Sequence, residues 1–437
     1  MEQKSDSFVH WFRQAGPYIN KHRGKTFVIA FPGEALADTA AFKALIQDVA
    51  LLNILGVRLV LVHGARMQIN ERVKQAGLSA NFSHGLRVTD PATLRCVQDA
   101  AGAVRIEIEA LLTTGVANTP MHGARLRVCS GNYVVARPFG VRDGVDFHHT
   151  GEVRRIDADG IRRQLADDEV VLLGPLGYSP TGEVFNLSFE DVATETAIAL
   201  HADKLIFVSD QPGVLNSAGE LMREISPQAV ETLLQEHRIS EEQTRQLRAA
   251  AKACRTIARA HILPWQEDGA LLRELFTRDG CGTLLTLESY DQVRTATIDD
   301  IVGLLELLRP LEEDGVLVRR SRELLETEVE QFTVIIRDGM IIGCAALYPF
   351  AEESKGELAC VAVHKDYRAG KRGDILLREI TERAQAMGLK TLFVLTTRTA
   401  HWFMERGFVP VEIDHLPARK KALYNFQRNS KVFEKQI

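Results

Sequence analysis

The chain has 437 residues, of which 45% are hydrophobic and 25% are charged, and its formal net charge is -5. This length exceeds what one hydrophobic core usually organises, so we expect a globular protein of two domains. The negative charge argues against a nucleic-acid partner, which would need a concentrated basic surface. No apolar run reaches membrane-spanning length and no signal-peptide pattern is seen, so we expect no membrane association and a cytoplasmic location.

The six cysteines are scattered without metal-binding or redox spacing. This distribution is typical of free thiols in a reducing compartment rather than of a disulfide framework. The adjacent pair His148 and His149 is interpreted as a polar turn, because adjacent side chains diverge. We therefore expect no bound metal.

The N-terminal segment has apolar residues at helical spacing, which predicts a helix over residues 5–22 that Gly16 and Pro17 interrupt. The apolar residues are Phe8, Trp11, Phe12 and Ala15. Such a stripe needs burial, so it covers either its own domain or a neighbouring subunit.

Strands and helices then alternate up to about residue 285. Strands are predicted over residues 25–31, 57–64, 169–175 and 203–210, and helices over 39–55 and 189–201. Apolar strands separated by helices are typical of a parallel sheet that is covered on both faces. We expect an α/β domain over residues 1–285 with a mainly parallel sheet between helices.

A different pattern follows a short polar segment, residues 286–294, which we interpret as a linker. Thr297 or Asp299 is expected to cap a helix that runs to Leu308. Helices are then predicted over 322–331, 374–387 and around Trp402, and strands over 332–337, 341–349, 357–363 and 391–396. The short turns between the first three strands predict a mixed, largely antiparallel sheet in a second α/β domain, residues 295–437.

The stretch from Gly356 to Asp374 joins an apolar strand to a basic, glycine-rich loop that opens a helix. Amide groups at a helix N-terminus are unpaired and partly positive, so a pyrophosphate fits there. Arg368, Lys371 and Arg372 would add full charges. The alternative is an ordinary surface loop with solvated basic residues.

The segments VAVHKDYRAGKRGDILL and WFMERGF, in this order of elements, resemble the GCN5-related N-acetyltransferase (GNAT) family. The resemblance implies acetyl-CoA as co-substrate, with Arg368, Lys371 and Gly373 matching the family's pyrophosphate loop. Lys371 departs from that pattern, which has a glycine at its position. The residues implied to bind CoA are Val361, Val363, Arg368, Ala369, Gly370, Lys371, Arg372, Gly373 and Asp374.

Acetyl transfer to an amine requires a base, a polarised thioester and a proton for the leaving thiolate. Glu357, where the strand enters the site, is the candidate base, and the alternative is a solvated carboxylate at a strand edge. The backbone of residues 360–363 is expected to pair with the pantetheine chain and to place an N–H near the thioester oxygen. The family's usual tyrosine acid is replaced by Phe403, so Thr396 is the candidate acid.

Both domains together resemble the bacterial N-acetylglutamate synthase family. The matching segments are GKTFVIAFPGEAL, RLVLVHGARMQIN, FNLSFEDVATETAIAL, ADKLIFVSD, LLRELFTRDGCGT, VLVRRSRE, GELACVAV, LFVLTTR, HWFMERGF and LYNFQRNS. The resemblance implies acetylation of L-glutamate, the first step of L-arginine biosynthesis. It also implies that Arg320 and Arg428 hold the glutamate carboxylates, with Val318 and Cys360 beside them. Guanidinium forks suit a dicarboxylate.

The first domain resembles an amino-acid kinase of the N-acetylglutamate kinase type but lacks several of its phosphate contacts. Ala30 replaces the lysine at the end of the first strand, residues 63–66 replace a glycine run, and Glu190 replaces an aspartate. Lys252 alone keeps a matching position. Phosphoryl transfer depends on such cations and backbone donors, so we expect a domain that binds rather than phosphorylates.

The same domain resembles arginine-sensitive kinases, which implies feedback inhibition by L-arginine and assembly into a hexamer through the N-terminal helix. The implied arginine contacts are Tyr18, Lys204, Glu274, Phe276, Thr277, Gly280 and Gly282. Two alternatives stay open: an acetyltransferase for another acidic amino acid, and an arginine-sensing protein with a silent transferase domain. Lys371 and Phe403 are the residues that favour the second.

Overall fold

The computed structural model describes residues 2–113, 126–236, 239–287, 291–337, 339–368, 371–424 and 429–437. The chain folds into two compact units, Met1–Glu288 and Ser289–Ile437. The boundary falls inside the predicted linker. Residues 292–294 of that segment, however, belong to a strand of the second unit, because they pair with the strand that follows them in its sheet.

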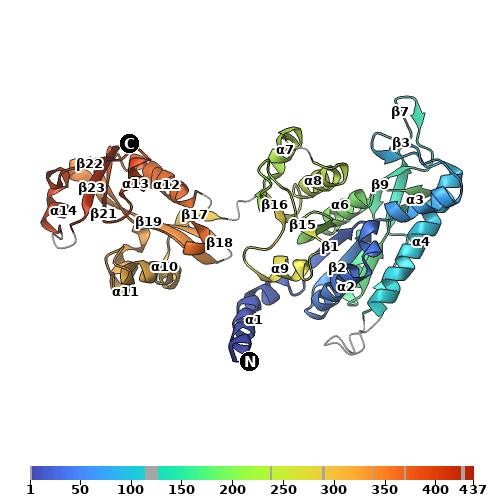
Figure 1. Ribbon diagram of the computed structural model, residues 1–437, viewed down its shortest axis with the longest axis horizontal. Helices are drawn as coiled ribbons and strands as arrows, with labels where there is room; N and C mark the ends of the chain where they lie inside the picture. Colours follow the sequence, from blue (N-terminus) through green and yellow to red (C-terminus); the bar gives the residue numbers. More distant parts are fainter. Residues whose placement is uncertain are drawn as a thin grey trace. The chain divides into compact units, whose positions relative to one another are not determined.

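The first unit is built on an eight-stranded sheet with the order β14-β16-β15-β13-β1-β2-β10-β5 (Figure 1). All neighbouring strands in it are parallel except β15 and β16. In sheet order the strands are β14 (Glu224–Ile225), β16 (Thr283–Thr286), β15 (Arg259–Pro264), β13 (Lys204–Ser209), β1 (Thr26–Phe31), β2 (Arg58–His63), β10 (Val170–Leu173) and β5 (Val128–Cys129).

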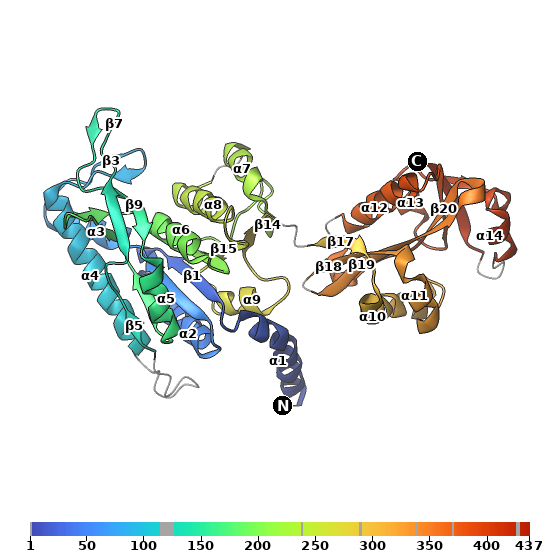
Figure 2. The ribbon, with the colours of Figure 1, turned by 180° about the vertical axis from the view of Figure 1, so that it is seen from behind.

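Both faces of this sheet are buried, as the continuous apolar strands predict. Side chains alternate along β1, so Val28 and Ala30 join one core with α6 and α8, whereas Phe27, Ile29 and Phe31 join another with α2 and α4 (Figures 1 and 2). The helices are α2 (Thr39–Ile54), α3 (Arg66–Gln75), α4 (Pro91–Thr113), α5 (Ala158–Ala166), α6 (Phe189–Leu200), α7 (Val230–Glu236), α8 (Glu241–Ala253) and α9 (Ala270–Phe276). The predicted sheet between helices is confirmed.

A second, four-stranded sheet in this unit has the order β12-β11-β6-β9. Its strands are β12 (Val184–Asn186), β11 (Leu176–Tyr178), β6 (Val134–Pro138) and β9 (Gly151–Ile156), and two hairpins lie near it: β3 (Phe82–Ser83) with β4 (Leu86–Arg87), and β7 (Val141–Arg142) with β8 (Val145–Asp146). These short strands were not predicted, because segments of two to six residues carry little periodicity.

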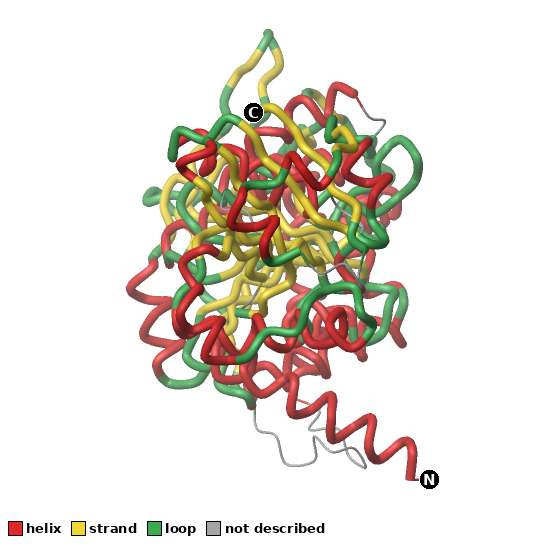
Figure 3. Tube along the Cα trace, turned by 90° about the vertical axis from the view of Figure 1, so that its left-hand side faces the viewer, coloured by secondary structure: helices red, strands yellow, loops and turns green. Residues whose placement is uncertain are grey.

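The N-terminal helix α1 (Glu2–His22) continues through Pro17, so the predicted interruption is wrong. Proline lacks the N–H that would bond the carbonyl of Arg13, but both residues are exposed and water can satisfy that carbonyl. The helix extends away from the rest of its unit (Figure 3), with Trp11 44% and Phe12 55% exposed. Its apolar stripe is thus only partly covered by its own domain.

The second unit contains a seven-stranded sheet with the order β17-β18-β19-β20-β21-β23-β22, antiparallel except between β20 and β21. The strands are β17 (Gln292–Thr295), β18 (Phe332–Arg337), β19 (Met340–Phe350), β20 (Lys355–Val363), β21 (Thr391–Thr396), β23 (Lys431–Gln436) and β22 (Val409–Val411). The mixed, largely antiparallel sheet is confirmed.

Helices cover both faces of this sheet. Residues of α12 share a core with Leu358 and Leu392, whereas residues of α10 share another with Cys360 and Ala362. The helices are α10 (Ile301–Glu313), α11 (Arg322–Glu328), α12 (Arg372–Ala386), α13 (Ala400–Met404) and α14 (Ala418–Ala422). Thr297 forms a capping box with Asp300 just before α10. Of the two predicted caps, Thr297 and Asp299, it is Thr297 that caps this segment.

Candidate functional site

The parallel strands β20 and β21 pair only at their beginnings. Their ladder runs from Lys355 opposite Thr391 to Glu357 opposite Phe393. Beyond it, the described residues of the two strands pair with β19 and β23 but no longer with each other. On the side that faces β21, the β20 backbone past Glu357 therefore has no strand partner among the described residues. Backbone groups need hydrogen-bond partners, so this opening suits an extended, amide-bearing ligand such as a pantetheine chain.

A β-bulge lies at the same opening. Cys344 and Ala346 of β19 oppose Ala362 and Ala359 of β20, which leaves one extra residue on β20. Cys360, inside the bulge, has φ = 51°, in the left-handed region that non-glycine residues seldom adopt. Bulges redirect side chains and backbone amides and are frequent beside active sites. This irregularity falls in the segment predicted to hold the thioester.

Glu357 lies where β20 and β21 separate and is only 7% exposed. Its Oε2 is 2.7 Å from Nζ of Lys420, a residue of α14. A buried, ion-paired carboxylate is not the solvated strand-edge residue of the alternative interpretation. Lys420 had not been singled out in the sequence, because α14 is a short, charged segment far from Glu357 along the chain.

Thr396 ends β21 and is 9% exposed. Its hydroxyl accepts a hydrogen bond from the Thr399 amide at 3.1 Å and lies 2.8 Å from the Thr399 hydroxyl. Phe403 is buried and packs edge-on against Trp402 and Phe408, with ring centroids 4.9 and 5.4 Å apart. The position of the usual tyrosine acid thus faces the core, and Thr396 supplies a hydroxyl at the strand end.

Arg320 approaches the bulge from the loop after α10. Burial alone would lower its pKa, but the Cys360 thiol, the Tyr348 phenol and Glu328 hold the pKa of this guanidinium above its ordinary value. Arg320 Nη1 also donates to the Val318 carbonyl at 3.2 Å. Arg320 thus lies near Cys360 and contacts the Val318 backbone, and the role of these three residues in substrate binding stays a prediction.

Two of these neighbours were missed in the sequence. Tyr348 lies opposite Glu357 in the β19–β20 register, and its hydroxyl donates to Glu328 Oε2 at 2.7 Å. Strand register is a tertiary property, and nothing in the local sequence marks either residue. The predicted carboxylate-binding residue Arg428 lies outside the described residues.

The basic loop ends at Lys371, the N-cap of α12, with φ = 56°. Lys371 thus has a left-handed backbone conformation, which glycine adopts without strain. This agrees with the glycine that the family has at this position. Gly373 is closely packed, since a Cβ there would lie 2.8 Å from Trp402 Cζ2. Ala369 and Gly370 lie outside the described residues.

The charged side chains of this loop differ in their exposure to solvent and in their ion pairing within the protein. Arg368 and Lys371 are exposed, and Val361 and Val363 are half-buried on β20. Arg372 Nε is 2.7 Å from Asp291 Oδ2, a carboxylate that also pairs with Arg337, so the Arg372 side chain is engaged within the protein while its backbone N–H remains at the helix N-terminus. Asp374 pairs with Arg406, which lowers the pKa of this carboxyl. The loop predicted to hold the pyrophosphate therefore combines helix-terminal amides with two exposed cations.

We expect Lys371→Gly to raise the free energy of unfolding by about 1 kcal/mol, because glycine adopts φ = 56° without strain. The same change should make CoA affinity less dependent on salt, because a screened charge is lost. Lys371→Gln is the matched control, since it removes the charge but keeps the strain. Thermal unfolding and calorimetric CoA titration at two ionic strengths measure both effects. An equal or steeper salt dependence in the glycine variant would refute the electrostatic role.

The predicted arginine contacts of the first unit converge around Glu274 of α9. Glu274 Oε2 accepts the amides of Cys281 and Gly282 at 2.7 and 3.0 Å, and Oε1 lies 2.7 Å from His261 Nδ1. Burial opposes ionisation of Glu274, but the hydrogen bonds from His261 and the two amides outweigh it and lower its pKa to about 2. The result is an ionised carboxylate in a site of low exposure.

Glycine is required at two positions of this site. A Cβ on Gly280, which has φ = 59°, would meet the Glu274 carboxylate, and a Cβ on Gly282 would meet the Ile262 carbonyl. Thr277 ends α9, and its hydroxyl donates to the Arg273 carbonyl at 2.6 Å. These contacts explain the residue types that the resemblance implied.

Lys204 and the end of α1 complete the cluster. Lys204 Nζ lies 3.3 Å from His261 Nε2, and burial together with Lys204 lowers the pKa of His261 to about 4. His22 bonds the Leu275 carbonyl at 2.7 Å and contacts the rings of Tyr18 and Phe276. The two histidines had not been predicted. They connect the predicted residues of α1, β13 and α9.

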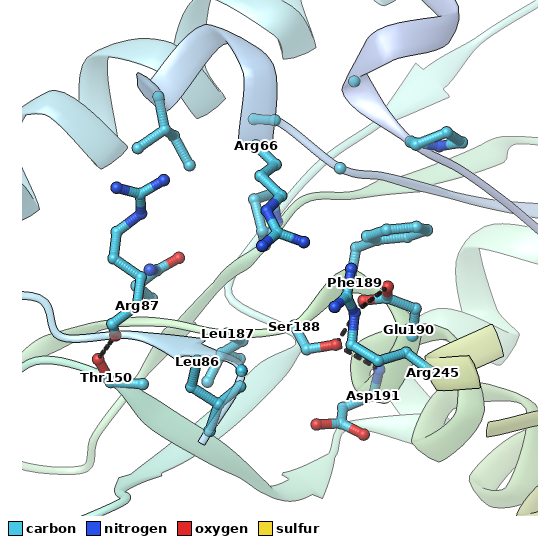
Figure 4. A pocket seen from close by; sticks show the side chains of 18 of the residues that line it. Arg66, Leu86, Arg87, Thr150, Leu187, Ser188, Phe189, Glu190, Asp191 and Arg245 are labelled. Carbon is cyan, nitrogen blue, oxygen red and sulfur yellow. Dashed lines mark hydrogen bonds and ion pairs between the residues drawn. The ribbon is translucent and has the colours of Figure 1, made fainter. Parts of the chain in front are cut away.

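A separate cavity of about 160 Å³ opens at the ends of β1 and β2 in the first unit (Figure 4). Arg66 and Arg87 lie at one end, both over the Phe82 ring at 5.4 and 4.6 Å. At the other end, Glu190 pairs with Arg245 at 3.1 Å. In the part of the chain that the structure describes, no carboxylate lies within 4.0 Å of the Arg66 or Arg87 guanidinium.

Four of the positions compared with kinases add no unpaired cation to this cavity, whereas Arg66, in the segment that replaces the glycine run, lines it. Ala30 is fully buried in the core, and His63 is 1% exposed, with burial lowering its pKa to about 4. Lys252 pairs with Glu195 at 2.6 Å. Glu190 is balanced by Arg245, so its charge is already compensated within the protein.

Neither a metal-binding cluster nor a membrane-spanning helix occurs within the described ranges. No group of three or more histidine, cysteine, aspartate or glutamate side chains there could hold a metal ion. No helix there is both long and apolar enough to cross a membrane. The cytoplasmic location stays a prediction.

Comparison with known proteins identifies both units. Residues 25–263 match the amino acid kinase family, and residues 301–408 match the acetyltransferase (GNAT) family. Amino-acid acetyltransferases from Pseudomonas fluorescens and Azotobacter vinelandii are each 58% identical to this chain over 432 and 431 residues, 98% of this chain and 99% of each relative.

A solved structure has the same fold over the whole chain. N-acetylglutamate synthase from Neisseria gonorrhoeae, complexed with coenzyme A and L-arginine, is 37% identical, with a TM-score of 0.86 over 98% of this chain and 99% of its own. The same enzyme complexed with coenzyme A and N-acetyl-glutamate is 38% identical, with equal coverage and a TM-score of 0.63. With its kinase-like and GNAT units joined in one chain, this protein is an amino-acid N-acetyltransferase and belongs to the N-acetylglutamate synthase family.

Proposed function

We propose that the protein transfers the acetyl group of acetyl-CoA to the α-amine of L-glutamate, giving N-acetyl-L-glutamate and CoA as the first step of L-arginine biosynthesis. The observation that carries this proposal is the opening where β20 and β21 separate, at which the buried, ion-paired Glu357 lies three residues before the bulged Cys360. We assign Glu357 as the base, the bulged segment as the seat of the thioester, and Arg320, which lies near Cys360, as a carboxylate-binding cation. The complexes of the N. gonorrhoeae enzyme with coenzyme A and N-acetyl-glutamate support the substrate pair.

The reaction is a direct transfer. Glu357 takes a proton from the substrate ammonium, and the freed electron pair of the nitrogen attacks the thioester carbonyl. A backbone N–H of the bulged segment 360–363 stabilises the oxyanion that forms. The carbon–sulfur bond then breaks while the nitrogen releases its second proton. Thr396 gives a proton to the leaving thiolate, and the proton released by the nitrogen restores the Thr396 hydroxyl through solvent. Arg320 and Arg428 hold the carboxylates, which keeps the amine in line with the carbonyl.

The direct test is CoA release from acetyl-CoA with L-glutamate and, separately, with L-aspartate. Glutamate should be preferred by at least about tenfold in kcat/KM, because a side chain one methylene shorter misplaces either the amine or a carboxylate. Equal rates would favour an acetyltransferase of broader acidic specificity. No release with either amino acid would favour an arginine-sensing protein with a silent transferase domain.

We further propose that L-arginine inhibits the enzyme by binding at the cluster around Glu274. An ionised carboxylate suits a guanidinium, and a carboxylate accepts up to about four hydrogen bonds, of which three are occupied here. Gly280 and Gly282 allow backbone carbonyls to approach a ligand closely. The complex of the N. gonorrhoeae enzyme with L-arginine supports this assignment.

Glu274→Gln should weaken inhibition by L-arginine roughly 10- to 100-fold, because a charge-assisted hydrogen bond is replaced by a neutral one. Activity without arginine should change little, because the substitution lies in the kinase-like unit. Glu267→Gln is the matched control: that exposed glutamate pairs with Arg273 on the same segment. Arginine titration of CoA release and of melting temperature provides the measurement. Unchanged inhibition in Glu274→Gln would place the arginine site elsewhere.

The kinase-like unit is proposed to bind arginine without phosphorylating a substrate. Ala30 supplies no charge, and Lys252 and Glu190 are each engaged in an ion pair within the protein. The helix α1 is proposed to join subunits into a hexamer, supported by the exposed Trp11 and Phe12 at its middle.

A further inference from the structure

The transferase unit contains an ion pair between Lys420 and Glu357 to which the proposed reaction gives no role. Nζ and Oε2 are 2.7 Å apart, and the two side chains are 27% and 10% exposed. The segment that carries Lys420 is held in place: the Ala418 amide donates to Glu353 Oε1 at 3.3 Å, and Lys421 pairs with Asp414. These contacts hold the backbone of α14, and with it the Cα of Lys420, close to Glu357.

Other ionisable groups near Glu357 are engaged elsewhere. Those facing it from adjoining elements are Lys420 of α14, Tyr348 of β19, Glu434 of β23, Lys355 and Cys360 of β20, and His415, with Arg320 near Cys360. Lys355 pairs with Glu434, which also lies 3.7 Å from His415. Tyr348 donates to Glu328, and burial raises the pKa of the Cys360 thiol to about 11. Among the described residues, Lys420 is the cation in contact with Glu357.

We propose that Lys420 is a positioning residue that keeps Glu357 ionised and oriented until the ammonium of the amino-acid substrate takes its place. The proposal rests on the assignment of Glu357 as the base. Burial favours the protonated form of a carboxyl group, and a protonated carboxyl cannot accept the substrate's proton. A cation in hydrogen-bond contact favours the charged form instead.

The substrate ammonium has the same charge and the same kind of donors as Nζ. It can therefore displace Lys420 without leaving a buried carboxylate unpaired, and the partly exposed lysine can turn to water. After displacement, the N–H bond of the ammonium breaks, the proton moves to Glu357, and the nitrogen keeps the electron pair for attack. Glu357 later returns the proton to solvent.

The experiment is the pH profile of kcat/KM for glutamate in Lys420→Met, Lys420→Gln and Lys420→Arg. In the methionine and glutamine variants, the acid limb should move to higher pH by about one unit, because loss of the cation favours the protonated base. The arginine variant should keep the wild-type limb. Lys421→Met is the matched control, since the neighbouring Lys421 pairs with Asp414 and not with Glu357. Lys420→Gln keeps a hydrogen-bond donor, so it separates charge from packing if the methionine variant folds poorly.

An unmoved acid limb in Lys420→Gln overturns the proposal, and so does a fall in rate that is equal at every pH, which would indicate a structural role. Glu357→Gln, measured alongside, distinguishes the two levels of assignment. If that variant keeps wild-type activity, the base itself is misassigned. If it loses activity while Lys420→Gln keeps the wild-type profile, only the role of Lys420 is wrong.

Discussion

Glu357→Gln should lower CoA release with saturating glutamate by at least about 100-fold near neutral pH, because an amide cannot take the substrate's proton. Glutamine keeps the size of the side chain and one oxygen that can accept a hydrogen bond from Lys420, so the fold should be preserved. The KM for acetyl-CoA should change little, since the proposed CoA seat lies farther along β20 and at the start of α12. Steady-state rates at several pH values give the measurement.

The pH dependence of this variant is a second readout. Without a base, only substrate molecules that are already unprotonated react, so the residual rate should keep rising with pH. Glu352→Gln is the matched control, because Glu352 is an exposed carboxylate in the turn before β20. A loss smaller than threefold in Glu357→Gln would remove Glu357 from the mechanism.

Arg320→Ala should raise the KM for glutamate roughly 10- to 150-fold, with a smaller effect on kcat at saturation. Hydrogen bonds between charged groups contribute about 1.5–3 kcal/mol, and alanine removes both the charge and the donors. A residue that holds a substrate carboxylate equally in the ground state and in the transition state affects binding more than turnover. Initial rates over a wide range of glutamate concentration separate the two parameters.

Arg322→Ala is the control for Arg320→Ala. Arg322 is two residues away, its side chain is 67% exposed, and it pairs with Glu326 on its own helix. Exposed pairs of this kind contribute little, so its kinetic constants should match those of the wild type. Arg320→Lys should fall between the wild type and the alanine variant, because lysine keeps the charge but not the planar fork. An unchanged KM in Arg320→Ala would show that glutamate binds elsewhere.

Local patterns predicted the elements that build the transferase site. The strands Phe332–Arg337 and Thr391–Thr396 were predicted with the bounds they have, because apolar runs flanked by turn residues are short-range features. The left-handed Lys371 could be anticipated from the glycine that the family has at this position. Pro17 was misread, since an exposed helix can tolerate a missing hydrogen bond that a buried one cannot.

The sequence by itself determined the two α/β domains through apolar periodicity, and its resemblance to a known family indicated the residues of both proposed sites, because such patterns are written along the chain. Only the tertiary structure decided that Lys420 contacts Glu357, that Tyr348 lies opposite it, and that His261 links Lys204 to Glu274. Each of these contacts joins segments that are distant in sequence. Such pairings depend on strand register and helix packing, which the whole fold sets and no local pattern encodes.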